Sequence, residues 1–176
     1  KQIMPSRVID LGFGVPSFYI KDCLISRSFH LTLCDESPLA FSFSTELLNI
    51  WSPGRWSEAI DFLLADMMDV PLCIGNYDLY LFQDSIEHTK NPTECLTKFV
   101  AMSDWESKFL LSLPLGPKIP MHTISWNSRE EAFEWLKKCG LQPRISKLVH
   151  TNSEIDLFAS SIDGGFTEYI VLCDKI

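Results

Sequence analysis

Short apolar runs alternate with amphipathic stretches along most of the chain. The apolar runs have the length of strands, and the amphipathic stretches place their apolar residues along one face of a helix. This alternation predicts an α/β fold, in which helices cover a mostly parallel sheet. Seven strands are predicted, over Arg7–Leu11, Leu31–Cys34, Phe62–Leu64, Tyr77–Phe82, Lys108–Leu113, Ile145–Val149 and Glu168–Cys173.

Capping residues mark where the helices begin. Ser37-Pro38 combines an N-cap with proline at the first helical position, and Asn91–Glu94 and Ser128–Glu131 have the pattern of capping boxes. A further helix is predicted over Val15–Leu24, directly after the first strand. No helix is predicted between the last two strands, so we expect the chain to close in a hairpin around Asp163–Gly165.

Length and composition indicate one globular unit. The chain has 176 residues, of which 46% are hydrophobic and 22% are charged. It is long enough for one domain with a sizeable core and short for two, so we predict a single domain over residues 1–176. The six cysteines are scattered without a C-x-x-C pair. This pattern favours reduced, buried thiols in a cytoplasmic protein over a disulfide framework.

Charge and hydropathy restrict the partners. The formal net charge of -8 argues against non-specific binding to nucleic acid, although it leaves a local basic patch open. No apolar run approaches the roughly 20 residues that a membrane-spanning helix needs. Lys1–Arg7 also lacks the apolar region of a signal peptide. We therefore expect neither a nucleic-acid partner nor a membrane span, and the sequence does not predict the oligomeric state.

A glycine turn follows the first predicted strand. Gly12 and Gly14 stand between this strand and a helix, where such a turn cradles a nucleotide-type cofactor. Asp35 ends the second strand, where a carboxylate accepts hydrogen bonds from ribose hydroxyls. These residues alone fit NAD as well as other adenosine ligands, and also fit an ordinary turn without a ligand. The dinucleotide fingerprint, however, requires a glycine at position 17, which is Ser17.

Five segments, in the correct order, resemble the S-adenosylmethionine (SAM)-dependent methyltransferases of class I. Asp10–Gly14 resembles their D-x-G-x-G motif, and Asp35 stands at their ribose-binding acid. Leu64–Met67 resembles the segment whose acid faces the adenine amino group, and Tyr77–His88 resembles their FD-x-V…D-x-L-E-H stretch. The capped helix, Gly140 and the final hairpin resemble the end of the family's domain. The closest subgroup methylates small molecules such as quinone precursors and natural products.

This resemblance implies a Rossmann-like three-layer sandwich, with a seven-stranded, mostly parallel sheet and an antiparallel last strand. It implies SAM as cofactor and S-adenosyl-L-homocysteine (SAH) as product. The residues that it implies for cofactor binding are Asp10, Gly12, Phe13, Gly14, Asp35, Glu36, Asp66, Met67 and Gln83. Gln83 is expected near the transferred methyl group.

Two departures from the family pattern bear on cofactor binding. Pro16 stands where the family usually has a third glycine, and proline removes a backbone N–H that could face the cofactor. Only Lys1–Ser6 precedes the first strand, where family members commonly have a helix that closes over cofactor and substrate. That N-terminal cap helix is expected to be missing from this chain.

The loop after the fourth strand carries the candidate catalytic residues. His88 is the predicted base for an oxygen acceptor, with Asp84 beside it; alternatively, Glu87 and His88 only cap a helix or bind backbone groups. His122 lies where relatives place substrate-facing residues, and an exposed loop histidine fits it equally. Trp126 could line the same pocket, but packing in the core is the better interpretation.

The same loop also contains residue types that bind metals. Asp84, Glu87 and His88 are such residues, but they are tightly spaced and lack a further, distant ligand. We therefore predict no metal site.

The predicted function is methyl transfer from SAM to an oxygen or nitrogen atom of a small-molecule acceptor. One alternative is a catalytically silent, methyltransferase-like binding or assembly domain, which Pro16 and the short N-terminal lead favour. Another is an NAD-dependent oxidoreductase, which Ser17 and the methyltransferase-like second half disfavour.

Overall fold

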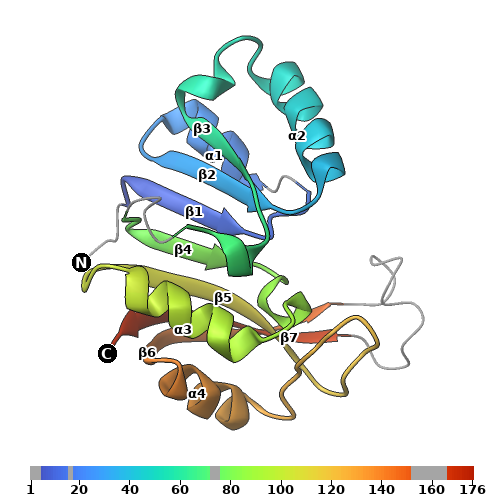
Figure 1. Ribbon diagram of the computed structural model, residues 1–176, viewed down its shortest axis with the longest axis vertical. Coiled ribbons are helices and arrows are strands. Elements are labelled where there is room, and N and C mark those ends of the chain that lie inside the picture. The colour runs from blue at the N-terminus through green and yellow to red at the C-terminus, as the bar shows by residue number, and fades with distance from the viewer. Residues whose placement is uncertain (1–4, 16–17, 72–75, 152–165) are drawn as a thin grey trace.

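In the computed structural model, seven strands form one sheet, in the order β3-β2-β1-β4-β5-β7-β6 (Figure 1). The structure describes residues 5–15, 18–71, 76–151 and 166–176. The strands are β1 (Arg7–Leu11), β2 (His30–Asp35), β3 (Ile60–Leu64), β4 (Leu79–Phe82), β5 (Lys108–Leu115), β6 (Leu141–Thr151) and β7 (Phe166–Lys175).

The first five strands pair parallel with one another, and β7 pairs antiparallel with both β5 and β6. A strand that follows its neighbour without a crossover helix must run in the opposite direction. This explains why the direction reverses only at β7. The Rossmann-like sandwich with an antiparallel last strand is thus confirmed.

Four α-helices connect the strands: α1 (Phe18–Ser26), α2 (Pro38–Trp51), α3 (Pro92–Met102) and α4 (Arg129–Lys138). The three predicted caps form as expected. The side chains of Ser37, Asn91 and Ser128 each accept a hydrogen bond from a backbone N–H in the first turn of α2, α3 and α4. Each cap satisfies a donor that the helix leaves unpaired, and so fixes where the helix begins.

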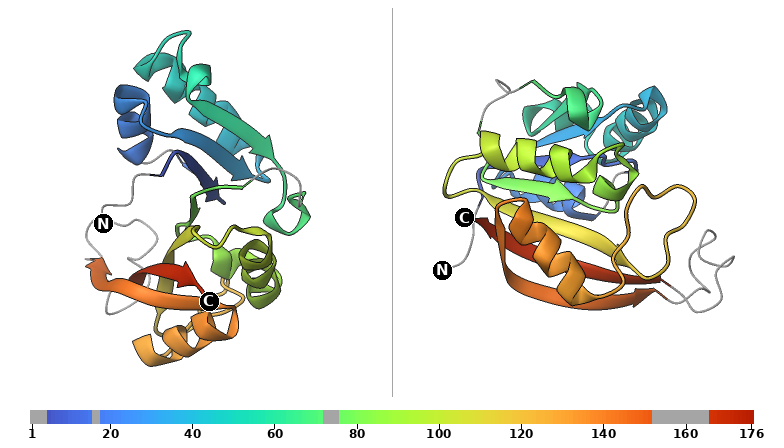
Figure 2. Two further views of the ribbon diagram at one scale, coloured as in Figure 1. Left: turned by 90° about the vertical axis from the view of Figure 1, so that its left-hand side faces the viewer. Right: turned by 60° about the horizontal axis from the view of Figure 1, so that its bottom comes forward.

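The core divides into two apolar clusters, one on each face of the sheet. Val8, Leu31 and Leu33 pack with residues of α1 and α2. Ile9 and Tyr80 pack with residues of α3 and α4 on the other face. Neighbouring residues of a strand point to opposite faces of the sheet. Because helices cover both faces, apolar side chains are buried on both, and the parallel strands are mostly apolar along their length. Figure 2 shows α1 and α3 on opposite sides of the sheet.

Several element boundaries differ from the prediction. β4 begins at Leu79 rather than Tyr77, and just before it the Asp78 carboxylate accepts hydrogen bonds from the backbone N–H groups of Ser6 and Arg7. α1 extends to Ser26, beyond the predicted Leu24. Among the described residues between β3 and β4, the only helix is the single 3-10 turn Met67–Asp69, where the alternation predicted a full helix.

Five of the six cysteines lie within the described residues, and all five are buried and free: Cys23, Cys34, Cys95, Cys139 and Cys173. Burial raises the pKa of each thiol, to about 11 for Cys23 and Cys139 and about 12 for the other three. The prediction of buried thiols is confirmed for these five, and Cys73 lies outside the described residues. In the described part of the chain, no helix has the length and apolar character to cross a membrane.

Candidate functional site

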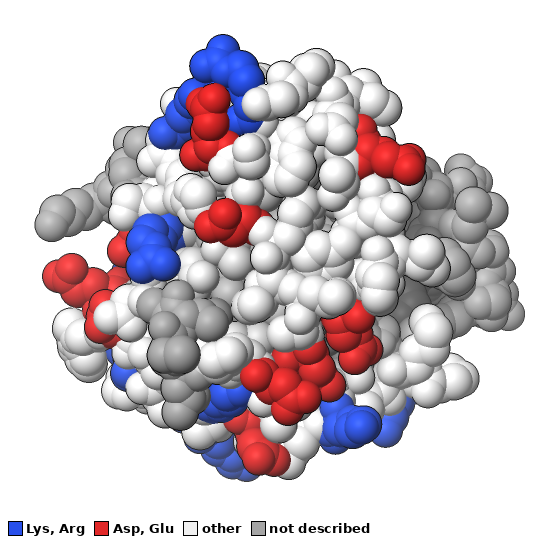
Figure 3. Space-filling model, turned by 45° about the horizontal axis from the view of Figure 1, so that its top comes forward, with Lys and Arg blue, Asp and Glu red and all other residues white. Residues whose placement is uncertain are grey.

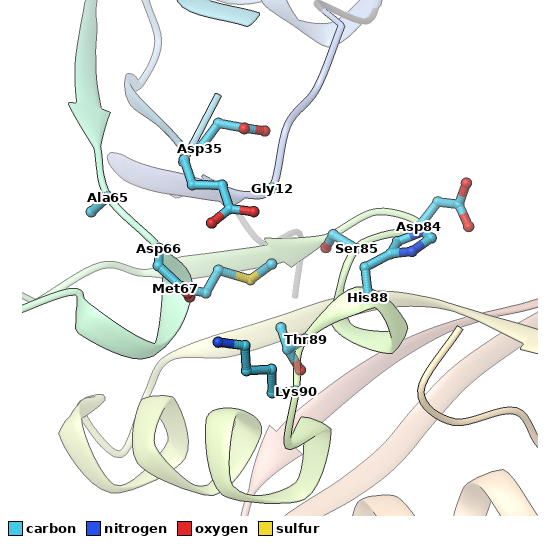
Figure 4. Close-up of a pocket in the computed structure, with 11 residues that line it drawn as sticks. Gly12, Asp35, Ala65, Asp66, Met67, Asp84, Ser85, His88, Thr89 and Lys90 are labelled. Atoms are coloured by element: carbon cyan, nitrogen blue, oxygen red, sulfur yellow. The ribbon is translucent and has the colours of Figure 1, made fainter. Parts of the chain in front are cut away.

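A pocket of about 260 Å³ opens at the carboxyl ends of the parallel strands (Figure 4). It lies where the strand order reverses, because β1 pairs with β2 on one side and β4 on the other. Open α/β sheets bind their ligands in this crevice. The residues that line the pocket are Gly12, Asp35, Glu36, Ala65, Asp66, Met67, Asp84, Ser85, His88, Thr89 and Lys90.

The glycine turn brings the backbone of β1 against the loop after β4. Gly12 has a φ of 74°, and a Cβ at this position would lie 2.7 Å from the Cβ of Ser85 and 3.0 Å from the Cε of Met67. The φ is in the left-handed region that favours glycine, and the space admits no side chain. Gly14 also has a positive φ, of 54°, but a Cβ there would meet nothing within 4 Å.

Two acids at the ends of β2 and β3 are fixed by backbone donors. The Asp35 carboxylate accepts hydrogen bonds from the N–H groups of Gly14 at 3.0 Å and Ser37 at 2.8 Å. Asp66 accepts one from Met68 N at 2.8 Å. Carboxylates held in this way keep further lone pairs for a ligand. In Figure 4 these two acids lie on one side of the pocket, and Asp84 and His88 lie on the other.

The charges around the pocket are mostly negative. Four carboxylates line it, from Asp35, Glu36, Asp66 and Asp84, whereas Lys90 is the only Lys or Arg among the lining residues. Such a lining attracts a cationic ligand and repels a phosphate. The face of the molecule in Figure 3 likewise shows its described Lys and Arg in separate groups rather than in one basic patch.

Asp10 lies beneath the glycine turn rather than in the pocket wall. Its side chain is buried, and its Oδ2 accepts hydrogen bonds from the Tyr19 hydroxyl and, at 3.5 Å, from Gln83 Nε2. Its Oδ1 has no hydrogen-bond partner. Burial raises the pKa of Asp10 to about 7, although the two hydrogen bonds act in the opposite direction. Asp10 and Gln83 therefore contact each other, and neither residue lines the pocket.

Four titratable side chains meet at the other end of the pocket: Asp84, Glu87, His88 and His122. One donor atom from each lies within 4.8 Å of the others. The first three come from the loop after β4, which includes the 3-10 turn Ile86–His88, and His122 comes from the loop after β5. Asp84 adopts a left-handed backbone conformation, with a φ of 48°, and its N–H donates to Ser112 Oγ.

Thr123 holds these two loops together. Its N–H donates to Glu87 O at 2.7 Å, and its hydroxyl contacts Glu87 O at 2.8 Å and Thr89 O at 2.6 Å. The His88 and His122 rings consequently meet edge to face, with centroids 4.9 Å apart. Burial, and then the neighbouring His88, lower the pKa of His122.

Glu87 is the most buried member of this group. Its side chain is fully enclosed, and neither carboxylate oxygen has a hydrogen-bond partner. Burial, together with the nearby Asp84 carboxylate, raises the pKa of Glu87 to about 9. The sequence suggested a helix cap or a backbone contact as the alternative role for Glu87, and its side chain makes neither. His88 does contact a backbone group, because its Nδ1 lies 3.2 Å from Met121 O.

Seven of the predicted site residues lie in the pocket wall: Gly12, Asp35, Glu36, Asp66, Met67, Asp84 and His88. Gly14 contacts Asp35 from the turn, and His122 adjoins His88. Pro16 and Ser17, on which two arguments about the turn depended, lie outside the described residues.

Two aromatic residues lie in the core rather than in the pocket wall. The Phe13 ring packs between Phe41 and Phe62 in the core, so its side chain does not line the pocket. Trp126 is 1% exposed and packs against Trp135, so its side chain is part of the core, as the second of the two interpretations of this residue expected, and it does not line the pocket. In each case the large apolar surface is buried where the helices meet the sheet.

Ser85, Thr89, Lys90 and Ala65 line the pocket but were not predicted as site residues. Their signal in the sequence is position alone, because they follow the ends of β3 and β4, where ligands contact the backbone and short side chains. Ser85 is the most informative of the four, since its buried Oγ has no hydrogen-bond partner and faces Gly12.

Comparison with known proteins reveals similarity in structure but not in sequence. No protein-family model and no curated protein matches the chain. Among solved structures, the O-methyltransferase of a trans-AT PKS multienzyme of Brevibacillus brevis, in complex with SAH, is similar with a TM-score of 0.73 and 13% identity. The similarity covers 97% of this chain and 67% of that one.

Two further structures extend this similarity. The [4+2]-cyclase SpnF has a TM-score of 0.70 and 12% identity over 97% of this chain and 75% of that one. The mitomycin 7-O-methyltransferase MmcR has a TM-score of 0.65 and 16% identity over 98% of this chain and 49% of that one. The fold and its crevice define a Rossmann-like α/β protein. More narrowly, the chain has the fold of the class I SAM-dependent methyltransferases.

Replacing Gly12 with alanine should destabilise the protein by roughly 2–4 kcal/mol, because the new methyl group would overlap Ser85 and strain the backbone. Gly14→Ala is the matched control, because its backbone is also in the left-handed region but a methyl group there would meet no other atom within 4 Å. It should lower the free energy of unfolding by about 1 kcal/mol. Urea unfolding of both variants measures the difference. Equal losses would show that the close approach to Ser85 contributes nothing.

Replacing Asp10 with asparagine should stabilise the ligand-free protein at high pH. Between pH 3.8 and about 7 the folded protein retains a proton that the unfolded chain has released, so the wild-type free energy of unfolding falls as pH rises. Asparagine does not titrate, so the free energy of unfolding of Asp10→Asn lacks this fall with pH. The variant should therefore become increasingly more stable than the wild type as pH rises from 3.8, by roughly 2–4 kcal/mol above pH 7. Urea unfolding at several pH values tests this, and a difference independent of pH would contradict it.

Proposed function

We propose that this protein transfers a methyl group from SAM to an oxygen atom of a small-molecule acceptor. The observation that carries the proposal is the acidic crevice against which Gly12 is packed. SAM bears a positive sulfonium and an α-amino group, and four carboxylates line the pocket. The pyrophosphate of NAD would meet the same carboxylates, so this lining argues against a nicotinamide cofactor.

The residues of the crevice fit an adenosine ligand that carries a cationic tail. Asp35 is positioned for the ribose hydroxyls, and Asp66 for the adenine amino group. The buried Ser85 Oγ has no hydrogen-bond partner, and Ser85 lies directly against Gly12. Such an atom is costly unless a ligand completes its hydrogen bonds. The shared fold of the Brevibacillus brevis O-methyltransferase, whose structure is a complex with SAH, supports SAM as the ligand of this crevice.

The chain's own residues would align the acceptor and take up its proton. The His88 Nδ1 lies 3.2 Å from Met121 O, and because a carbonyl can only accept, Nδ1 must carry the proton. Nε2 is then free to accept the proton of the acceptor hydroxyl. When bound, SAM supplies an activated methyl group: the acceptor oxygen bonds to the methyl carbon while the C–S bond breaks and leaves its electrons on sulfur.

Isothermal titration calorimetry with SAM, SAH and NAD tests the cofactor. We expect SAM and SAH to bind at micromolar concentrations and NAD not to bind. Asp35→Asn should weaken SAH binding by about tenfold, since a hydrogen bond to a charged group contributes about 1.5–3 kcal/mol. Asp69→Asn is the control, because this exposed acid lies outside the pocket wall and should leave the affinity unchanged.

Absence of SAM and SAH binding in a folded sample would overturn the proposal. A silent methyltransferase-like binding domain would then be the better description. Tighter binding of NAD than of SAH would instead favour an oxidoreductase.

A further inference from the structure

Asp84, Glu87, His88 and His122 form a compact group of donor atoms, which we call the acceptor-side cluster. One atom from each side chain lies within 4.8 Å of the other three. The cluster combines two carboxylates with two imidazoles. One ion at its centre would be within reach of all four, because metal–ligand bonds of about 2.0–2.2 Å place ligand atoms roughly 3–4.5 Å apart.

Glu87 is independent evidence that the cluster binds a ligand. Its side chain is fully buried, and both carboxylate oxygens lack a hydrogen-bond partner. The same cluster holds a second carboxylate, Asp84, which as an anion has no hydrogen to donate to Glu87. A buried carboxylate without a donor is strongly unfavourable. Either a shared proton or a cation must therefore hold these two acids together.

The imidazoles favour the cation. The N–H at Nδ1 of His88 is directed to Met121 O, which leaves Nε2 as a free electron pair. Metal-binding histidines are commonly oriented by this kind of contact from the other ring nitrogen. Thr123 fixes the loop that brings His122 against His88 before any ligand arrives. A shared proton between Asp84 and Glu87 would require neither histidine.

We propose that the acceptor-side cluster binds one divalent transition-metal ion, through Asp84, Glu87, His88 and His122. Mixed nitrogen and oxygen donors suit Zn²⁺, Fe²⁺, Mn²⁺ or Co²⁺, whereas Mg²⁺ and Ca²⁺ prefer oxygen alone. His122 supplies the distant ligand whose absence from the sequence pattern led us to predict no metal site. The proposal replaces that prediction.

The ion's role in the reaction rests on the proposed function. Asp84 and His88 also line the cofactor pocket, so the ion would lie at the end where the acceptor enters. An acceptor hydroxyl that contacts the ion would release its proton to solvent more readily, because the positive charge stabilises the oxyanion. His88 would then act as a ligand, and the ion would perform the activation assigned above to the free imidazole.

Metal titration of the full chain tests the site. The protein is stripped with a chelator and titrated with ZnCl₂ and MnCl₂ by calorimetry, and with CoCl₂ by visible absorption. We expect one ion per chain and a Co²⁺ spectrum typical of nitrogen and oxygen ligands. Glu87→Gln and His122→Asn should each weaken binding by about tenfold or more, since loss of an outer-shell partner alone has that effect.

His30→Asn is the matched control, because His30 pairs with exposed Asp61 outside the pocket wall and should not alter metal binding. Glu87→Gln retains the shape of the buried side chain, and thermal unfolding without metal verifies that each variant is folded. The proposal is overturned if no ion binds, or if Glu87→Gln and His122→Asn bind as the wild type does.

SAH titration of the same samples separates this proposal from the proposed function. Metal binding without SAH binding would retain the ion site and overturn methyl transfer. SAH binding without metal binding would overturn the ion site and leave His88 as the base.

Discussion

The position of β1 in the sheet determines where this protein can bind a ligand. β1 pairs with β2 on one side and with β4 on the other, so the chain leaves it in one direction and returns to it from the opposite direction. The loops after β1 and β4 diverge at this point and leave a crevice. Gly12 keeps that crevice narrow at its base, because only a residue without a side chain permits the contact with Ser85. The acids at the ends of β2 and β3 and the histidines after β4 and β5 lie around this point of close approach.

The crevice has two chemically different ends. Backbone N–H groups hold the carboxylates of Asp35 and Asp66, so these acids are satisfied before a ligand binds. At the other end Glu87 lacks any donor, and its environment is complete only with a proton or a cation. The acids at one end are therefore held by hydrogen bonds from the protein, whereas the buried carboxylate at the other end is not. The same fold occurs in O-methyltransferases and in a [4+2]-cyclase. One end of such a crevice can therefore keep its residues while the other end varies.

The sequence predicted the fold and the acids at the ends of β2 and β3 better than it predicted the acceptor-side cluster. Strand alternation and the caps at Ser37, Asn91 and Ser128 are local signals, so they placed the elements to within a few residues. Asp35 was predicted from its position at the end of the second strand, and Asp66 from the resemblance of Leu64–Met67 to the methyltransferase family. The contact of His122 with His88 depends on the hydrogen bonds of Thr123, which no spacing in the sequence reveals. The sequence left both a pocket role and a core role open for Trp126, because its burial against Trp135 is a property of the packed core.

The buried cysteines make the two faces of the sheet separately observable. Cys23 belongs to the apolar cluster beneath α1 and α2, whereas Cys95, Cys139 and Cys173 belong to the cluster beneath α3 and α4. A thiol that is enclosed and neutral reacts with an alkylating reagent only when its surroundings open. The order in which these positions become labelled would therefore report whether the α1 face of the native protein opens before the α3 face, or whether both open in one cooperative event.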